Sequence, residues 1–203
     1  MKIVVASGNQ KKLAELRRLA EGLPVEVLSP EEAGGPLPEV VEDGETFEAN
    51  AEKKALAFAR AFGLPAIADD SGICVDALGG APGVKSARYS GEEEVPDRDA
   101  RNNEKLLREL RGVPEARRLA RFVCALSLAF PDGRVHTVRG VWEGQIAFTP
   151  RGSGGFGYDP LFLIPHRGKT AAELEPEEKG RLSHRGAAMR AMRALLEGEF
   201  ARD

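Results

Sequence analysis

Short apolar runs alternate with amphipathic helical patterns along the 203-residue chain, and this alternation limits the possible fold more than any other feature. Apolar runs are typical of strands, whereas apolar residues recurring every three or four positions mark one face of a helix. Strands are predicted at residues 2–7, 25–28, 66–68, 73–78, 119–130, 134–148 and 161–164, and helices at about 11–22, 46–62, 97–110 and 184–200. Pro131-Asp132-Gly133 joins the two long runs and indicates a hairpin. The pattern predicts an α/β fold with a mixed sheet, in a single domain covering residues 1–203.

The composition excludes several classes of protein. Lys and Arg nearly balance Asp and Glu, for a net charge of −3, whereas duplex-binding proteins carry a basic excess. The longest apolar run, residues 122–130, is about half the length that spans a bilayer, and residues 3–6 are too short for a signal peptide. Cys74 and Cys124 lie in apolar contexts without a CxxC pattern, which favours small buried side chains. We therefore expect a cytoplasmic protein that binds neither nucleic acid nor membranes.

The first strand leads into a helix through Ser7-Gly8-Asn9-Gln10-Lys11-Lys12. A helix N-terminus presents unpaired N–H groups and a partial positive charge, which suit a phosphate. An ordinary helix cap with solvated lysines explains the same residues. The segment is not a Walker A loop, because GxxxxGK[ST] is missing from the chain.

Two polar features belong to the second predicted helix. Asn50 and Lys54 are four residues apart and lie on one side of it. Glu42-Asp43-Gly44-Glu45 forms an acidic loop just before it. An acidic run at a helix N-terminus is also explained by a favourable interaction with the helix dipole.

The segment Asp69-Asp70-Ser71-Gly72 follows the apolar run 66–68 and is expected to form an acidic turn. Adjacent carboxylates raise each other's pKa unless a cation compensates them. Hard cations such as Mg²⁺ bind carboxylate oxygens and complete their shell with phosphates and water. A turn held by side-chain hydrogen bonds is the alternative interpretation.

The segment Gly152-Ser153-Gly154-Gly155-Phe156-Gly157 matches GxGxxG but is not a dinucleotide fingerprint, because a strand follows it and not a helix. The glycines are better suited to close approach of the backbone to a planar ligand, on which Phe156 or Tyr158 could stack.

Lys179, His184 and Arg185 lie before and at the start of the last helix, where Ser183 is an N-cap candidate. They offer donors to a carbonyl or phosphate. The histidines lack the spacing of a zinc site or a catalytic triad.

In their order along the chain, these features resemble the inosine triphosphate pyrophosphatase family, whose members hydrolyse non-standard purine nucleoside triphosphates such as dITP and XTP. The matching stretches are SGNQKKLAE at 7–15, EDGETFEANAEKKA at 42–55, IADDSGICVDALGGAPGVKSARYSG at 67–91, GSGGFGYDPLF at 152–162 and TAAELEPEEKGRLSHRG at 170–186. The resemblance covers nearly the whole chain. It implies an elongated mixed sheet flanked by helices, with the active site in a cleft between two lobes, and a homodimer.

The resemblance also implies roles for individual residues. Glu42 and Asp70 would bind Mg²⁺, and Asp70, with Asp69 beside it, would accept a proton. The phosphates and base would be bound by Ser7, Gly8, Asn9, Gln10, Lys11, Lys12, Lys54, Ser71, Phe156, Gly157, Tyr158, Asp159, Lys179, His184 and Arg185. The implied reaction converts ITP, dITP or XTP to the monophosphate and pyrophosphate. A pyrophosphatase for modified pyrimidine nucleotides and a non-hydrolytic nucleotide sensor are the alternatives, although a sensor has no need for Asp69 and Asp70.

Overall fold

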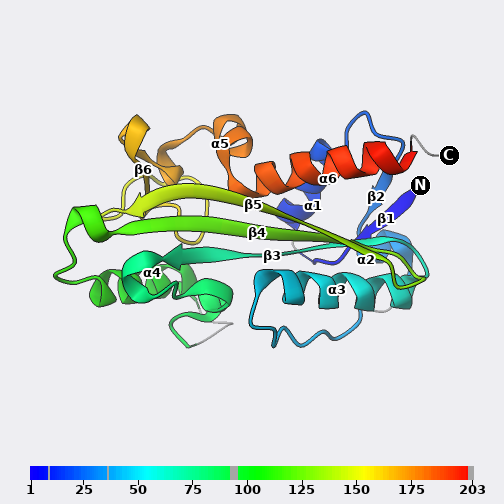
Figure 1. The fold of residues 1–203 in the computed structure, drawn as a ribbon, viewed down its shortest axis with the longest axis horizontal. Coiled ribbons are helices and arrows are strands. Elements are labelled where there is room, and N and C mark those ends of the chain that lie inside the picture. The colour runs from blue at the N-terminus through cyan, green and yellow to red at the C-terminus, as the bar shows by residue number, and fades with distance from the viewer. Residues whose placement is uncertain (9, 36, 92–95, 201–203) are drawn as a thin grey trace. The chain divides into compact units, whose positions relative to one another are not determined.

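The computed structural model describes residues 1–8, 10–35, 37–91 and 96–200 (Figure 1). Its helices are α1 (Gln10–Leu19), α2 (Pro30–Ala33), α3 (Phe47–Phe62), α4 (Arg98–Glu109), α5 (Pro176–Leu182) and α6 (His184–Phe200). Its strands are β1 (Lys2–Val5), β2 (Glu26–Leu28), β3 (Ala66–Val75), β4 (Leu119–Ala129), β5 (Val135–Ile146), β6 (Phe162–Ile164) and β7 (Lys169–Thr170). Short 3₁₀ helices lie at Asp76–Leu78 (η1), Gly83–Arg88 (η2), Glu115–Arg117 (η3), Pro165–Arg167 (η4) and Ala171–Glu173 (η5).

The described strands form one seven-stranded sheet in the order β2-β1-β3-β4-β5-β6-β7. β1 runs parallel to β2 and β3, whereas β6 runs antiparallel to β5 and β7. This mixed sheet flanked by helices confirms the predicted fold class. The chain divides into two compact units: unit 1 is Met1–Asp70, Cys124–Gly140 and Ala187–Asp203, and unit 2 is Ser71–Val123 and Val141–Gly186.

In unit 1, helices cover both faces of the strands. Because successive side chains of a strand point to opposite faces, β1 supplies Ile3 to one apolar cluster and Val4 to another. The Ile3 cluster contains residues of α1 and α6, and the Val4 cluster contains residues of α3. Figure 1 accordingly shows α6 and α3 on opposite sides of the strands. The alternation predicted from sequence is thus satisfied by helices on each face.

Residues 69–72, predicted to form an acidic turn, instead belong to the continuous strand β3. β3 pairs with β1 and lies between β1 and β4 in the sheet. The strand conformation of β3 outweighs the local turn preference of Asp, Ser and Gly, so the prediction of a turn is wrong. As a consequence, Asp69 and Asp70 point to opposite faces: Asp69 shares the face of Ile67, and Asp70 shares that of Ala68.

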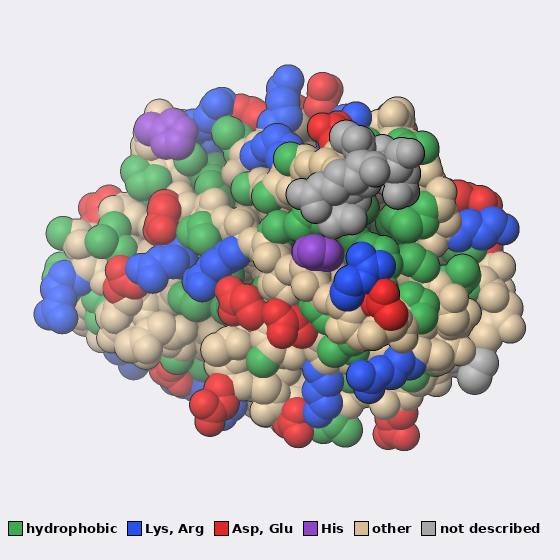
Figure 2. Space-filling view, turned by 45° about the vertical axis from the view of Figure 1, so that its right-hand side comes forward, with side chains coloured by type: hydrophobic (Ala, Val, Ile, Leu, Met, Phe, Trp, Pro, Cys, Tyr) green, Lys and Arg blue, Asp and Glu red, His purple; other side chains and the backbone are tan. Residues whose placement is uncertain are grey.

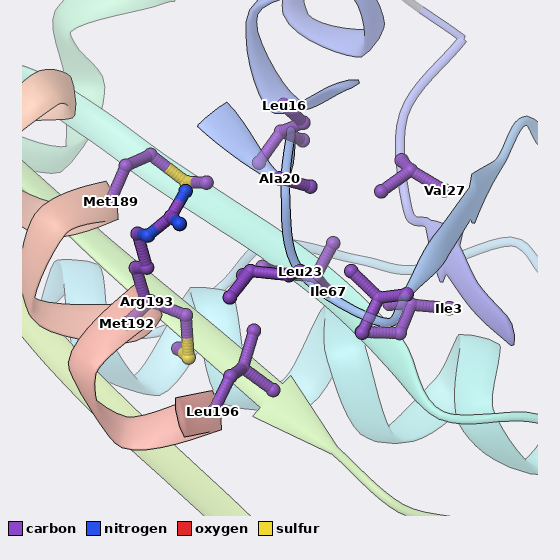
Figure 3. Close-up of a pocket in the computed structure, with 11 residues that line it drawn as sticks. Ile3, Leu16, Ala20, Leu23, Val27, Ile67, Met189, Met192, Arg193 and Leu196 are labelled. Carbon is purple, nitrogen blue, oxygen red and sulfur yellow. The ribbon is translucent and has the colours of Figure 1, made fainter. Parts of the chain in front are cut away.

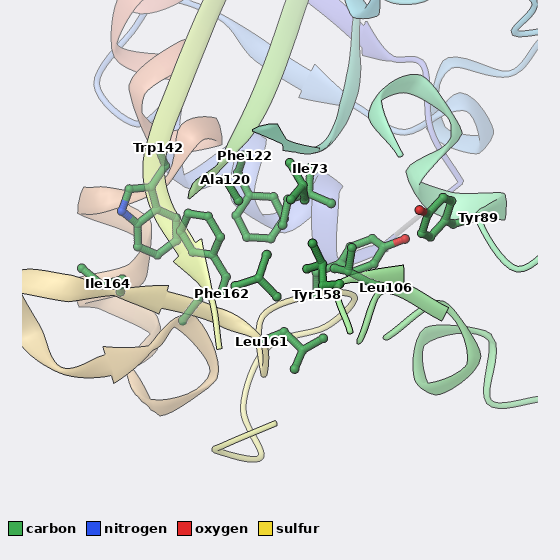
Figure 4. Packing of buried hydrophobic residues seen from close by; sticks show 14 of the residues in the cluster. Ile73, Tyr89, Leu106, Ala120, Phe122, Trp142, Tyr158, Leu161, Phe162 and Ile164 are labelled. Carbon is green, nitrogen blue, oxygen red and sulfur yellow. The ribbon is translucent and has the colours of Figure 1, made fainter. Parts of the chain in front are cut away.

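Unit 2 is built around an aromatic core (Figure 4). The Phe162 ring centroid lies 4.4 Å from that of Phe122 and 5.1 Å from that of Trp142. Leu106 of α4 is fully buried in the same cluster. Tilted aromatic pairs at such distances add to the free energy of burial. The core therefore joins α4 to the strands of unit 2.

An apolar pocket in unit 1 lies between α1, α6 and the strands (Figure 3). Leu16, Met189 and Leu196 are among its lining residues, and Arg193 is the charged side chain among them. Arg193 donates a hydrogen bond to the Glu21 carbonyl at 2.8 Å. The pocket therefore belongs to the apolar packing of α1 against α6.

Charged side chains of both signs are interspersed on the face shown in Figure 2. Two exposed pairs are Lys53 with Asp43, at 2.6 Å, and Arg193 with Glu197, at 3.0 Å. Exposed pairs of this kind contribute little to the free energy of folding. No helix in the described part of the chain is long and apolar enough to cross a membrane.

Arg118 is a buried arginine that satisfies backbone carbonyls in unit 2. Its side chain donates to the carbonyls of Leu110 at 3.1 Å, Ile146 at 2.9 Å and Ala147 at 3.2 Å. Only 3% of the residue is exposed, and burial lowers the pKa of its guanidinium. Arg118→Met would leave these carbonyls without their charged donor. We expect the free energy of unfolding to fall by about 3 kcal/mol, measured by urea denaturation.

Arg117→Met is the matched control, since Arg117 is adjacent in sequence and exposed. Its unfolding free energy is expected to stay within about 0.5 kcal/mol of the wild type. Similar urea midpoints for the two variants would contradict a structural role of the buried guanidinium.

Candidate active site

The predicted site residues fall into two groups, one in each unit. Unit 1 contains Ser7, Gly8, Gln10, Lys12, Glu42, Lys54, Asp69 and Asp70, and unit 2 contains Ser71, Phe156, Gly157, Tyr158, Asp159, Lys179, His184 and Arg185. Asn9 and the side chain of Lys11 lie outside the described part of the structure. Ser7 is half-buried just after β1, and Gln10 begins α1, so the strand and the helix of the predicted segment are present.

Asp69 connects β3 to α1. Its Oδ1 accepts a hydrogen bond from the Lys12 Nζ at 2.9 Å, and only 6% of the aspartate is exposed. A buried carboxylate needs such a partner, because desolvation of an uncompensated charge is costly. Lys12 is thereby held in the first turn of α1, where the helix N-terminus already favours anions. The Lys12 ammonium group therefore lies where the sequence predicts phosphate binding, with Asp69 as its counter-ion.

Asp70 points to the α3 side of β3. Its Oδ2 accepts a hydrogen bond from the Asn50 Nδ2 at 2.9 Å. The pKa of Asp70 is raised chiefly by burial, then lowered by the Asn50 hydrogen bond, raised by Glu42, lowered by Lys54 and raised least by Asp69. The weak effect of Asp69 agrees with its position on the opposite face. Burial thus gives the Asp70 carboxylate a higher affinity for a proton than an exposed aspartate has.

Lys54 lies one turn beyond Asn50 on α3. Its Nζ forms an ion pair with Glu42 and donates to the Asp69 carbonyl oxygen at 3.3 Å. The lysine side chain is only 15% exposed, which strengthens its interaction with the carboxylate. Lys54 therefore joins the acidic loop before α3 to the backbone of β3.

Asn50 is a site residue whose role the sequence does not assign. It is 1% exposed, and its Oδ1 accepts a hydrogen bond from the Gly44 N–H at 2.8 Å while its Nδ2 donates to Asp70. A Cβ at Gly44 would lie 2.6 Å from the Asn50 Oδ1, so the loop can approach the amide only as glycine. The i, i+4 spacing of Asn50 and Lys54 is the sequence signal that points to this residue. Asn50 orients the acidic loop and Asp70 together.

The donor atoms of unit 1 fit a divalent cation. Glu42 and Asp70 present carboxylate oxygens, and the charge of Glu42 contributes to the raised pKa of Asp70. No group of three or more His, Cys, Asp or Glu side chains forms a metal-binding cluster within the described residues. Two carboxylates with positions left for water and phosphate suit Mg²⁺, which rarely has an all-protein ligand shell.

Unit 2 surrounds the Phe156 ring with cations. Phe156 is 48% exposed, with the Lys179 Nζ 4.6 Å and the Arg185 guanidinium carbon 5.8 Å from its ring centroid. Lys179 comes from α5, a helix that the sequence pattern did not predict, and also pairs with Asp159. The Asp159 Oδ2 accepts a hydrogen bond from the Phe156 N–H at 2.8 Å. An exposed ring beside donor-only cations is suited to a planar base that carries acceptors.

His184 and Arg185 begin α6 and are both 8% exposed. The His184 ring stacks on Phe122 at 4.8 Å between centroids. Ser183 accepts a hydrogen bond from the Gly186 N–H at 3.1 Å, which confirms it as the N-cap. Packing and capping thus fix the direction in which this end of α6 presents its side chains.

The glycine loop is followed by strand β6, in agreement with the rejection of a dinucleotide fingerprint. Gly155 has a φ of +74°, and a Cβ there would lie 2.1 Å from the Asp159 Oδ2. The glycine therefore allows Asp159 to reach the backbone of its own loop.

Ser71 lies half-buried on β3, in the unit 2 part of that strand.

Comparison with known proteins identifies the family. The model of the Ham1 family matches residues 3–195. The chain is 51% identical to a dITP/XTP pyrophosphatase from Anaeromyxobacter sp. (strain Fw109-5), over 97% of each chain. A HAM1 protein from Coxiella burnetii has a TM-score of 0.89 at 42% identity, covering 98% of this chain and 99% of its own.

A nucleoside-triphosphatase/dITP/XTP pyrophosphatase from Mycobacterium abscessus is 48% identical with a TM-score of 0.78, covering 96% of this chain and 97% of its own. The similarity extends over almost the full length of the chain in each comparison. The resemblance inferred from the sequence motifs is confirmed, and the chain belongs to the Ham1 family.

Proposed function

We propose that this protein hydrolyses non-standard purine nucleoside triphosphates (dITP, XTP and ITP) to the monophosphate and pyrophosphate, removing them from the nucleotide pool. The similarity to dITP/XTP pyrophosphatases over nearly the full chain supports this activity. The observation that carries it is the charge arrangement of unit 1, where Asp70 lies half-buried beside Glu42 and Lys54. Such an arrangement suits a water-activating base next to a polyphosphate.

Residues of unit 1 perform the chemical step. Asp70, oriented by Asn50, accepts a proton from a water molecule while the oxygen of that water bonds to the α-phosphorus. The bond between the α-phosphorus and the bridging oxygen breaks, and pyrophosphate leaves with that oxygen. Lys12, Lys54 and the N–H groups at the start of α1 stabilise the negative charge of the phosphates.

Mg²⁺ is the proposed cofactor, with Glu42 and Asp70 as its protein ligands. When bound, it neutralises phosphate charge and helps to orient the triphosphate. Asp69 acts through Lys12, whose ammonium group it holds near the N-terminus of α1.

Residues of unit 2 bind the base. Phe156 stacks on the purine, while Lys179, His184 and Arg185 provide hydrogen-bond donors. Gly157, Tyr158 and Asp159 form the loop that carries Phe156, and Ser71 contacts the substrate from β3. We also propose that the protein is cytoplasmic and forms a homodimer. Light scattering of the purified protein tests the dimer.

The products test the proposed reaction. Hydrolysis of ITP is expected to release IMP and pyrophosphate in equal amounts, because attack at the α-phosphorus breaks the α–β anhydride bond. In water labelled with heavy oxygen, the label should appear in IMP and not in pyrophosphate. Chromatography and mass spectrometry measure both, and formation of IDP with orthophosphate would contradict the proposed point of attack.

A further inference from the structure

Helix α4 holds the loop that carries Phe156 through two hydrogen bonds to a single residue. The Asp99 Oδ2 accepts from the Gly157 N–H at 2.7 Å. The Asn103 Nδ2 donates to the Gly157 carbonyl oxygen at 2.9 Å. Asp99 and Asn103 are four residues apart, so they lie on the same face of α4, one turn from each other. Both backbone polar groups of Gly157 are therefore bound by one helix.

The helix itself is fixed within unit 2. Asn102 is 3% exposed, and its amide accepts from the Ser90 N–H at 2.7 Å and donates to the carbonyls of Ser86 and Ala87 at 3.3 and 3.2 Å. Leu106 anchors the next turn in the aromatic core. The face of α4 that contacts Gly157 thus belongs to a rigidly packed element.

The residue after Gly157, Tyr158, is attached to the same segment that binds Asn102. The Tyr158 hydroxyl donates to the Ser86 carbonyl at 2.8 Å, and burial is the main cause that raises the pKa of Tyr158 and keeps its proton in place. The Ser86 Oγ accepts from the Ile73 N–H at 2.9 Å. Figure 4 shows Tyr158 among the buried residues next to Leu106 of α4. A hydrogen-bonded network therefore connects β3, η2, α4 and the Phe156 loop.

Gly157 has no side chain that could hold it in its observed conformation. Its φ is +59°, and no atom lies within 4 Å of where its Cβ would be. Glycine loses more conformational entropy on ordering than any other residue. If only a fraction of the molecules holds the loop in the binding conformation, the apparent affinity for the ligand is reduced by that fraction.

We propose that Asp99 and Asn103 are positioning residues for the purine base: by holding Gly157, they keep Phe156 in the conformation that stacks on the substrate. This role rests on the proposed function, in which Phe156 binds the base. Neither residue contacts the substrate. Their effect is on the affinity for the base and not on the reaction at the α-phosphorus.

Single alanine variants test this role. Asp99→Ala and Asn103→Ala are each expected to raise KM for ITP about tenfold, the effect of losing one well-placed hydrogen bond, while kcat stays within about threefold of the wild type. Asp99→Asn keeps an acceptor for the Gly157 N–H and should restore KM to near the wild-type value. This rescue separates the hydrogen bond from the loss of negative charge in the first turn of α4.

Glu104→Ala is the matched control, because Glu104 is an exposed acidic residue on the same helix. Its KM should not change. Amide hydrogen exchange at Gly157, followed by NMR, should be about tenfold faster in Asp99→Ala and unchanged in Glu104→Ala. This readout does not depend on turnover.

The outcomes distinguish the two proposals. Absence of ITP hydrolysis by the wild-type protein would contradict the proposed function. Normal wild-type turnover with unchanged KM in both alanine variants would overturn the positioning role alone. Unchanged Gly157 exchange in Asp99→Ala would overturn it as well, whatever the activity.

Discussion

In Arg185→Ala we expect the selectivity for ITP over ATP to fall well below its wild-type value, which should be on the order of 10⁴ in kcat/KM. Hypoxanthine has a carbonyl acceptor at O6, where adenine has an amino donor. Arg185 and Lys179 offer only donors, and both lie over the Phe156 ring. Bound adenine would leave buried donors of the site unpaired. This cost is the reason that a polar pocket can discriminate strongly against a base without the matching acceptor.

The measurement is kcat/KM for ITP, XTP, ATP and GTP in the wild type and its variants. Phe156→Ala should weaken all purines alike, because stacking does not depend on the substituents of the ring. Arg190→Ala is the control for Arg185→Ala, as Arg190 is exposed on the same helix α6. Equal wild-type values for ITP and ATP would refute selectivity, and an unchanged ratio in Arg185→Ala would remove Arg185 as the residue that reads O6.

Asp70→Asn should lose at least ~10²-fold in kcat, since the amide cannot accept the proton from water. The folded structure should survive the change. An asparagine at this position can still accept the Asn50 hydrogen bond through its carbonyl oxygen. The substitution also removes a charge that burial disfavours, as the raised pKa of Asp70 indicates. Steady-state kinetics and thermal unfolding provide the two readouts.

Asp43→Asn is the control for a general loss of negative charge. Asp43 neighbours Glu42 but is exposed and pairs with Lys53, so its replacement should leave kcat near the wild-type value. Chelation by EDTA should abolish wild-type turnover, and added Mg²⁺ should restore it. Recovery of Asp70→Asn at high Mg²⁺ would show that Asp70 is a ligand and not the proton acceptor. Near-normal turnover of Asp70→Asn without added Mg²⁺, or of the wild type in EDTA, would contradict the mechanism.

Local patterns in the sequence were sufficient for the helices that carry most of the site. Helix α3 begins after Thr46, whose side chain caps the Ala49 N–H at 3.1 Å, and ends at Gly63 in the left-handed conformation. Both residues have strong end preferences that act within a few positions. The start of α6 at His184 is set in the same way by Ser183. For these two helices, residues close in sequence determine the ends, and the prediction from sequence is confirmed.

Tertiary structure alone decided how the two acidic residues are used. Asp, Ser and Gly at 69–72 have a local preference for turns, but β3 pairs with β1 and continues through them. Strand geometry then directs Asp69 to Lys12 and Asp70 to Asn50, on opposite faces. No spacing in the sequence predicts these partners, because Lys12 is 57 residues from Asp69 and Asn50 is 20 residues from Asp70.

The same physical reason limits what the sequence tells about the loop that carries Phe156. Glycines at 154, 155 and 157 indicate a flexible backbone near a ligand, and the sequence alone determined that much. Gly157 is restrained by Asp99 and Asn103, which are 58 and 54 residues away along the chain. Hydrogen bonds to backbone groups leave little trace in the sequence, because the residue that is held contributes only its N–H and C=O. The sequence therefore determined which residues the loop offers to a ligand, and only the folded chain decided how the loop is held.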